Sequence, residues 1–145
     1  LREVDEDEFM KNIADIRSSC GDRAVLRAMH FYGDNARVEK QAAALKAGDF
    51  ETFKKYIIES GRSSYMYNQN VYSCKKASEQ PVSLALSLSE KLLDGCGAWR
   101  VHGGGFAGTI QAFVPLNKLD EYKDLMEKVF GSGSCYILSV GGVEL

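Results

Sequence analysis

A short run of glycines late in the chain constrains the fold more than any other feature of the sequence. Four of the six residues at positions 103–108 are glycine, and strand-like runs flank them at positions 98–101 and 110–114. Glycine at this density marks backbone that adopts positive φ, or that another molecule or chain segment approaches closely. An ordinary turn needs only one or two glycines. The sequence therefore predicts two strands joined by a loop of unusual conformation.

The part of the chain before residue 95 predicts helices, because its apolar residues recur every three or four positions. The residues expected to begin or end these helices are Asp5 with Glu8 as a capping box, Gly21, Gly48, Asp49 as a cap, and Pro81 in a first turn. The apolar faces are expected to comprise Phe9, Ile13 and Ile16; Val38, Ala42 and Leu45; Phe50, Phe53 and Ile57; and Val82, Ala85, Leu86, Leu92 and Leu93. Gly33, inside the second helix over residues 22–47, costs about 1 kcal/mol relative to alanine and permits a break there.

From residue 95 onward the pattern changes to strands. Runs at 96–102 and 109–114 flank the glycines, a helix capped by Asn117 follows, and residues 135–140 predict a last strand. The residues of that helix expected to point inward are Leu119, Tyr122, Leu125, Met126 and Val129. Helices followed by strand, loop, strand, helix and strand are the segregated order of an α+β domain.

The composition excludes several classes of partner. The chain has 145 residues, which fits one domain, and a net charge of −2 with no basic stripe, which argues against nucleic acid. No apolar run approaches the roughly 20 residues of a membrane span. Four cysteines without a C-x-x-C pair and only two histidines predict reduced, mostly buried thiols in a cytoplasmic protein and no structural zinc site. Because the chain begins at Leu1 without a signal-peptide pattern, we expect a piece of a longer protein.

The glycines at 103, 105 and 108 satisfy G-x-G-x-x-G, a pattern with several meanings. A dinucleotide site needs a helix after the loop, whereas residues 109–115 predict a strand. A protein-kinase loop needs a lysine on the next strand and the H-R-D and D-F-G motifs, which the sequence lacks. A tight connection between two strands, in which the glycines only permit close packing, stays open beside a functional loop.

Residues 97–108, GAWRVHGGGFAG, resemble the third conserved motif of the GHMP small-molecule kinases, in particular its galactokinase form G-[SA]-R-M-T-G-G-G-F-G-G. Upstream segments are similar to other motifs of the family and follow its order. They are LREV at 1–4, for L-R-E-V; RAMH at 27–30 and NARV at 35–38, for R-A-x-H and E-x-x-R-V; ALKAGDF at 44–50, for A-L-x-x-G-D-[FY]; and ESGRS at 59–63, for E-S-H-x-S. The resemblance covers essentially the whole chain.

The chain departs from the family pattern at four positions. Trp99 is an extra bulky residue before Arg100, His102 replaces a small hydroxyl residue, Ala107 replaces a loop glycine, and Gly61 replaces histidine. Ala107 matters most, because a β-carbon disfavours positive φ. We interpret these changes as a variant of the motif.

The resemblance implies that residues 1–145 are the C-terminal domain of a sugar kinase, with a ferredoxin-like antiparallel sheet packed against helices. A member of the galactokinase branch transfers the γ-phosphate of ATP to the C1 hydroxyl of galactose, with Mg²⁺ bridging phosphates. In the family the phosphate-binding loop, the carboxylate and the arginine belong to the N-terminal domain. Residues 81–89 imitate the serine-rich phosphate loop but lack its glycines and have helical spacing. We therefore expect this chain to bind no cofactor and to be inactive alone, with the N-terminal domain of its parent as its partner.

By the same resemblance, the glycine loop reaches across the cleft toward the phosphate-binding loop and forms part of the wall of the active site. The expected wall residues are Gly103, Gly104, Gly105, Phe106, Ala107, Gly108 and Thr109, and Arg100 and His102 are supporting candidates. We favour structural roles for both, and no residue of the chain is assigned as catalytic or metal-binding. An incomplete sheet would expose a strand edge and favour a homodimer. The alternatives are another GHMP sugar kinase, or a free-standing ferredoxin-like binding or regulatory module.

Two further polar groups have structural interpretations. His30 is expected to face a neighbouring helix. The tyrosines at 65, 67 and 72, together with Asn68, Gln69 and Asn70, are expected to form a packing patch between a helix and a loop rather than line a cleft.

Overall fold

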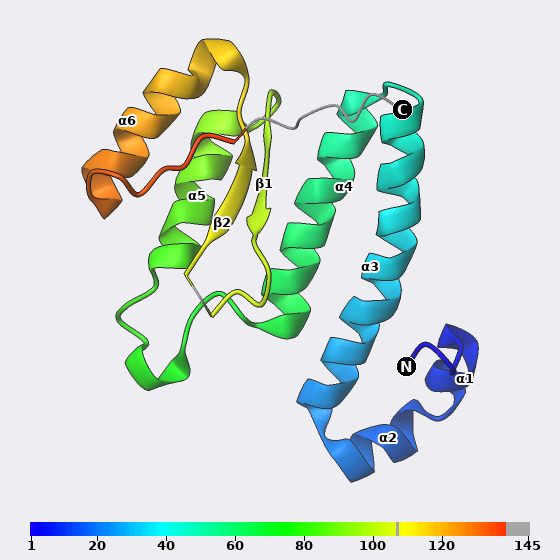
Figure 1. Cartoon of the computed structure of the whole chain (residues 1–145). Helices are drawn as coiled ribbons and strands as arrows, with labels where there is room; N and C mark the ends of the chain where they lie inside the picture. The colour runs from blue at the N-terminus through cyan, green and yellow to red at the C-terminus, as the bar shows by residue number, and fades with distance from the viewer. Residues whose placement is uncertain (107, 139–145) are drawn as a thin grey trace.

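Helices occupy the first two thirds of the chain, and a two-stranded sheet follows them (Figure 1). The computed structural model describes residues 1–106 and 108–138. The helices are α1 (Glu6–Lys11), α2 (Ile13–Cys20), α3 (Asp22–Lys46), α4 (Phe50–Ser63), α5 (Pro81–Leu93) and α6 (Leu119–Phe130). The strands are β1 (Ala98–Val101) and β2 (Ile110–Phe113), and the short turns are the π-helical η1 (Ser64–Asn68) and the 3₁₀-helical η2 (Cys74–Lys76) and η3 (Leu116–Lys118). The predicted α+β class is confirmed.

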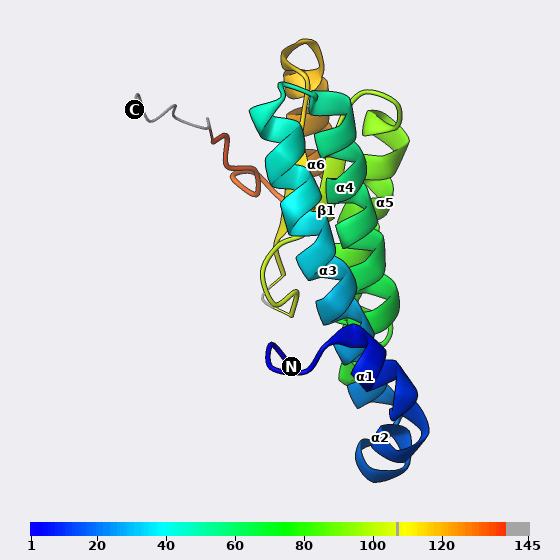
Figure 2. The same cartoon turned by 90° about the vertical axis from the view of Figure 1, so that its right-hand side faces the viewer.

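The sheet lies between two helical layers. In Figure 1 the α3–α4 hairpin is on one side of β1 and β2, and α5 and α6 are on the other. Figure 2 shows α1 and α2 at one end of the molecule, beside the start of α3. The ferredoxin-like arrangement stays a prediction, because it requires strands beyond these two.

Strands β1 and β2 pair antiparallel, and the glycine loop joins the end of β1 to the start of β2. Trp99 lies opposite Ala112, and Val101 lies opposite Ile110. Because side chains alternate along a strand, Trp99 and Val101 share one face, and both are buried there. The buried residues of this main core are Val71, Val82, Leu86, Leu93, Trp99, Val101, Tyr122 and Met126. The core thus joins the sheet to α5, α6 and the segment after η1.

Helix α4 approaches β1 so closely that a side chain is excluded at the crossing. A β-carbon on Gly61 would lie 2.9 Å from Cβ of Arg100 and 3.1 Å from the carbonyl oxygen of Trp99. Nearer the start of α4, Phe53 packs edge to face against Phe113 of β2, with ring centroids 5.4 Å apart. The absence of the family's histidine at position 61 therefore has a steric reason in this chain.

A second, smaller core holds the beginning of the chain. Phe9, Val25 and Ala28 are its buried residues. The predicted cap is confirmed, because Asp5 Oδ1 accepts a hydrogen bond of 2.7 Å from the Glu8 backbone. The single helix expected over this region is instead divided into α1 and α2 at Asn12, whose side-chain amide donates to the Glu8 carbonyl and so competes with the helical backbone bonds.

The other helix signals are mostly confirmed. Helix α3 continues through Gly33 without a break, where the Arg37 guanidinium packs over the space a side chain would fill. Asp49 Oδ1 accepts from the Thr52 backbone at 3.0 Å, and Pro81 begins α5. Asn117 is not the cap of α6, because it lies within η3 and the helix begins after Lys118.

Several residues expected on buried helix faces are exposed. Val38 is 57% exposed and Leu45 is 47% exposed, because α3 turns small residues such as Ala44 toward its neighbours instead. Phe50, at 64%, is the first residue of α4, where no other element covers it. On α6, Tyr122 and Met126 are buried as expected, but Val129 is 43% exposed. The expectation of mostly buried thiols is wrong, because Cys20 and Cys74 are exposed and Cys96 and Cys135 are only half-buried.

The predicted last strand is wrong over the residues that the structure describes. Residues 135–138 are irregular, and Tyr136 and Leu138 are 85% and 89% exposed. A strand requires a hydrogen-bonded neighbour, and none pairs with this segment in the described part of the chain. Positions 139 and 140 lie outside the described residues. None of the described helices is both long enough and apolar enough to cross a membrane.

The main core makes a direct prediction about stability. Leu93 is fully buried, whereas Leu84 on the same helix is 48% exposed. We expect Leu93→Ala to lower the free energy of unfolding by about 3 kcal/mol, because it leaves a cavity. Leu84→Ala is the matched control and should change it by less than about 0.5 kcal/mol. Urea titrations measure both, and equal losses would contradict the placement of Leu93.

Candidate functional site

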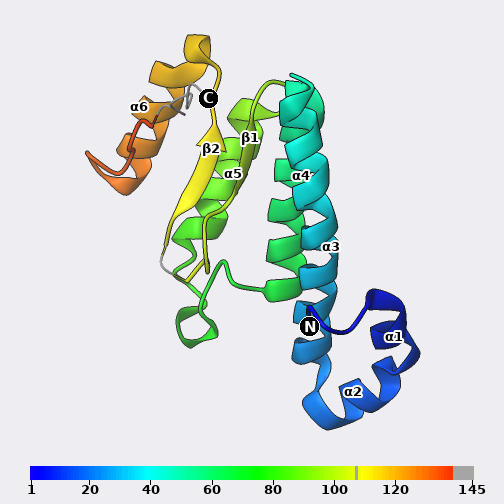
Figure 3. The same cartoon turned by 45° about the vertical axis from the view of Figure 1, so that its right-hand side comes forward.

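The glycine loop connects β1 to β2 and lies beside the segment that follows α4 (Figure 3). The backbone N–H of His102 donates to the Thr109 carbonyl at 3.1 Å, which extends the strand pairing into the base of the loop. Nearer the tip, the N–H of Gly108 donates to the Gly105 carbonyl at 3.0 Å. The loop is therefore folded back on itself rather than simply extended.

Three of the four loop glycines have backbone conformations that other residues rarely adopt. Gly103, Gly105 and Gly108 have φ of +59°, +84° and +84°. Gly105 is also pressed against Asn70, since a β-carbon there would overlap the Asn70 backbone oxygen and lie 2.8 Å from its side-chain Cγ. The fold thus explains the glycine at these three positions.

Gly104 is different, because nothing in the fold requires a glycine there. Its φ is outside the positive region, and no atom lies within 4 Å of the place a β-carbon would take. The same space is open at Gly103 and Gly108. Around these three residues the loop presents bare backbone to its surroundings, which leaves room for another molecule or domain to approach closely.

A π-helical turn supports the loop from behind. After α4, η1 ends at Gln69, whose φ of +51° makes it the only described residue other than glycine with positive φ. Asn70 follows and is only 5% exposed, and its side-chain amide donates to the Gly104 carbonyl at 3.2 Å. Of the packing patch expected around residues 65–72, Asn70 is buried and contacts the glycine loop, whereas Tyr65 and Tyr72 are 41% and 37% exposed. The sequence carried no signal for that contact, because 34 positions separate the two residues.

The two supporting candidates, Arg100 and His102, flank Val101 at the end of β1. Arg100 is half-buried against α4, and its Nε donates to the Val101 carbonyl at 3.2 Å. His102 is exposed at the base of the loop. Phe106 is 60% exposed. Ala107 lies outside the described residues.

A polar cluster joins α3 to α4 one turn before η1. His30 Nδ1 lies 3.0 Å from Ser63 Oγ, which confirms that His30 faces a neighbouring helix. Beside it, Asp34 accepts hydrogen bonds from Ser60 Oγ at 2.6 Å and from Arg37 at 3.1 Å. Burial lowers the pKa of His30 below its ordinary value and outweighs the opposing effect of Asp34, while the charges of Arg37 and Arg100 lower it further. The cluster thus favours a neutral imidazole.

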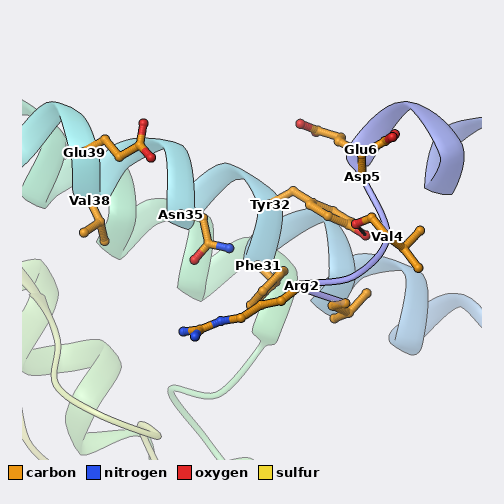
Figure 4. A pocket seen from close by; sticks show the side chains of 10 residues that line it. Arg2, Val4, Asp5, Glu6, Phe31, Tyr32, Asn35, Val38 and Glu39 are labelled. Carbon is orange, nitrogen blue, oxygen red and sulfur yellow. Dashed lines mark hydrogen bonds between the residues drawn. The ribbon is translucent and has the colours of Figure 1, made fainter.

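Two cavities lie away from the tip of the loop. The larger, about 520 Å³, is bounded by the first six residues and α3 (Figure 4). Its charged lining residues are Arg2, Asp5, Glu6 and Glu39. The second, about 370 Å³, is a groove between α4 and α5 whose lining includes Trp99 and Arg100. The ion pair between Arg62 and Glu90, with N and O 3.0 Å apart, links the two helices beside this groove.

The described residues offer no ready cage for a divalent cation. In positions 1–106 and 108–138, no three side chains of histidine, cysteine, aspartate or glutamate converge on one point.

Known proteins similar to the chain include kinases of a sugar. Among those named galactokinase, the protein of Mannheimia succiniciproducens is 25% identical to this chain over 126 residues, and that of Haemophilus influenzae Rd is 26% identical over 126 residues. The galactokinase of Homo sapiens is 30% identical over 139 residues. These alignments cover 87%, 87% and 96% of this chain, but only 31%, 31% and 32% of the three relatives. The chain therefore spans about a third of the length of the curated relatives it matches. No protein-family model and no solved structure matches it.

The loop glycines allow a paired test of the geometry. We expect Gly105→Ala to destabilise the protein by about 2 kcal/mol, because it combines a strained φ with an overlap at Asn70. Gly104→Ala, one residue away in open space, should change the free energy of unfolding by less than about 0.5 kcal/mol. Urea unfolding of both variants distinguishes them, and a larger loss in Gly104→Ala would show that the loop has another conformation.

The polar cluster predicts a pH dependence. Because the pKa of His30 is lower in the folded protein than its unfolded value near 6.5, the unfolded state binds more protons below about pH 6.5, and stability falls as the pH drops. In His30→Asn this part of the loss disappears, so the drop in urea midpoint between pH 7.5 and 5.5 becomes smaller. His102→Asn, at the exposed histidine, should retain the wild-type drop. An unchanged drop in His30→Asn would contradict the role of burial.

Proposed function

We propose that residues 1–145 form the C-terminal domain of a galactokinase, which transfers the γ-phosphate of ATP to the C1 hydroxyl of galactose. In this proposal the glycine loop is part of the wall of the active site. The rest of the parent chain binds the sugar, ATP and Mg²⁺, and the parent acts in the cytoplasm. Residues 1–145 alone are inactive.

Two aspects of the same sequence resemblance support the proposal. The first is the similarity to galactokinases, which extends over 87–96% of this chain and only about a third of each relative. That pattern is expected of one domain of a larger enzyme. The second is the ordered series of motifs along the chain, which ends in the glycine loop.

The single observation that carries the role of the loop is the bare backbone at Gly104. A glycine that the fold itself does not need is explained if another part of the enzyme approaches it. A phosphate group or the phosphate-binding loop of the parent is such a neighbour, since backbone N–H groups stabilise negative charge without a side chain in the way.

In this proposal residues 1–145 position the reacting groups and transfer neither a proton nor a phosphate. The wall contributes shape and backbone donors at the place where charge develops, and none of its members exchanges a proton with the sugar. Arg100 and His102 support the strand end and the base of the loop. This division explains why residues 1–145 are expected to show no turnover by themselves.

The proposal predicts a specific activity. The full-length parent encoded by the gene should release ADP from ATP when galactose is present, in an assay that couples ADP to NADH oxidation, and residues 1–145 should not. A panel of other hexoses distinguishes galactokinase from another sugar kinase of the same family. Turnover by residues 1–145, or a gene that encodes these residues alone, would contradict the proposal and favour a free-standing binding module.

The role of the loop has its own control within the parent. Gly104→Val fills the open space beside the loop without disturbing its packing, so we expect kcat/KM to fall about tenfold or more while the melting temperature stays within a few degrees of wild type. Unchanged kinetics would mean that the loop is only a turn.

A further inference from the structure

We infer that Asn70 is a positioning residue for the glycine loop, and that its amide fixes the direction in which one backbone N–H of the loop points. Its catalytic consequence rests on the proposed function, whereas its structural consequence does not. Asn70 belongs neither to the glycine motif nor to the other segments that resemble the kinase family.

The Asn70 side chain is held at both ends. Its Nδ2 donates to the Gly104 carbonyl at 3.2 Å, and its Oδ1 accepts from the Ser64 hydroxyl at 3.2 Å. Both residues are buried, with exposed fractions of 5% for Asn70 and 3% for Ser64. Because buried polar groups are costly to leave unpaired, this arrangement has little freedom to change.

The hydrogen bonds run in one direction along a chain of groups. Asn68 donates to the Ser64 hydroxyl at 3.4 Å, Ser64 donates to Asn70, and Asn70 donates to Gly104. Such a series strengthens each bond within it, because every donor is polarised by the one before. The series starts in η1, and π-helical turns are uncommon and often found at functional sites.

The backbone around Asn70 is shaped to make this contact. Gln69, immediately before it, has a left-handed conformation with φ of +51°, which costs free energy for a residue with a β-carbon. The turn brings the Asn70 backbone against Gly105, where a β-carbon would overlap it. Packing and hydrogen bonding therefore act on adjacent residues of the loop, Gly105 and Gly104.

Peptide geometry gives the contact its consequence. In a planar trans peptide the C=O of one residue and the N–H of the next point in opposite directions. Because the Gly104 carbonyl points toward Asn70, the N–H of Gly105 points away from it. In the described part of the chain that N–H has no acceptor. Asn70 thus aims the N–H of Gly105, a residue buried within the loop, away from its own amide. A backbone donor so placed suits a ligand or neighbouring group with an anionic oxygen, such as a phosphate.

The structural arm of the test uses residues 1–145. Asn70→Asp keeps the shape and the bond from Ser64 but replaces the donor with a carboxylate facing the Gly104 carbonyl. We expect the ¹⁵N-NMR order parameters of Gly104 and Gly105 to fall from about 0.85 to below about 0.6, while those of β1 and β2 stay unchanged. Asn117→Asp makes the same change at an exposed asparagine and should leave the loop unaffected. If Asn70→Asp does not fold, Ser64→Ala, which removes the hydroxyl that orients the amide, should give a smaller fall in the same order parameters.

The kinetic arm uses the full-length parent. Asn70→Asp should lower kcat about tenfold and leave the KM for galactose unchanged, because the loop is misplaced and the sugar site is not. A merely structural role would instead lower the melting temperature and leave the kinetic constants per folded enzyme intact.

The two arms separate the failure of this inference from the failure of the proposed function. A rigid loop in both Asn70→Asp and Ser64→Ala would overturn the inference, whatever the parent does. A mobile loop together with a parent that phosphorylates no sugar would support the positioning role and contradict the proposed function. Unchanged kinetics in an active parent with a mobile loop would overturn the catalytic part.

Discussion

The close approach of α4 to β1 at Gly61 is the contact on which the rest of the structure depends. It leaves no room for a side chain between the helix and Arg100, and it fixes α4 between α3 and the sheet. The same helix carries Ser60 and Ser63 into the polar cluster with α3. Where α4 ends, η1 begins, and from there the chain turns back to support the glycine loop. The position of the loop thus follows from how closely a helix lies on a strand.

The interface between α3 and α4 is polar where many helix pairs are apolar. Asp34 is at its centre, with bonds from Ser60 and Arg37, and His30 completes it through Ser63. No buried side-chain nitrogen or oxygen in the described residues lacks a hydrogen-bond partner. A satisfied network of this kind fixes one relative placement of two helices more narrowly than apolar packing, because each bond has a required direction.

Local signals predicted more of this molecule than long-range ones. The glycine density correctly predicted the loop and its two strands, and Asp5, Asp49 and Pro81 correctly predicted where helices begin, since each of these depends on neighbouring residues only. The apolar residues of α3 did not reveal that Val38 and Leu45 are exposed, because the pattern alone does not tell which face meets a neighbour. The support of the loop by Asn70 could not be predicted either, since it depends on a left-handed residue and on a contact between distant parts of the chain. Residues 135–138 have the composition of a strand, but composition supplies no pairing partner.

The two separate apolar cores have a consequence for how unfolding is observed. Trp99, the only tryptophan, is 6% exposed and belongs to the core around the sheet, whereas the core of Phe9, Val25 and Ala28 contains no tryptophan. Indole fluorescence therefore reports the half of the molecule that holds the glycine loop and is insensitive to the helices at the other end. Far-ultraviolet circular dichroism weights all the helices. A transition seen by dichroism at low denaturant and absent from fluorescence is thus the optical signature of α1 and α2 detaching before the sheet opens.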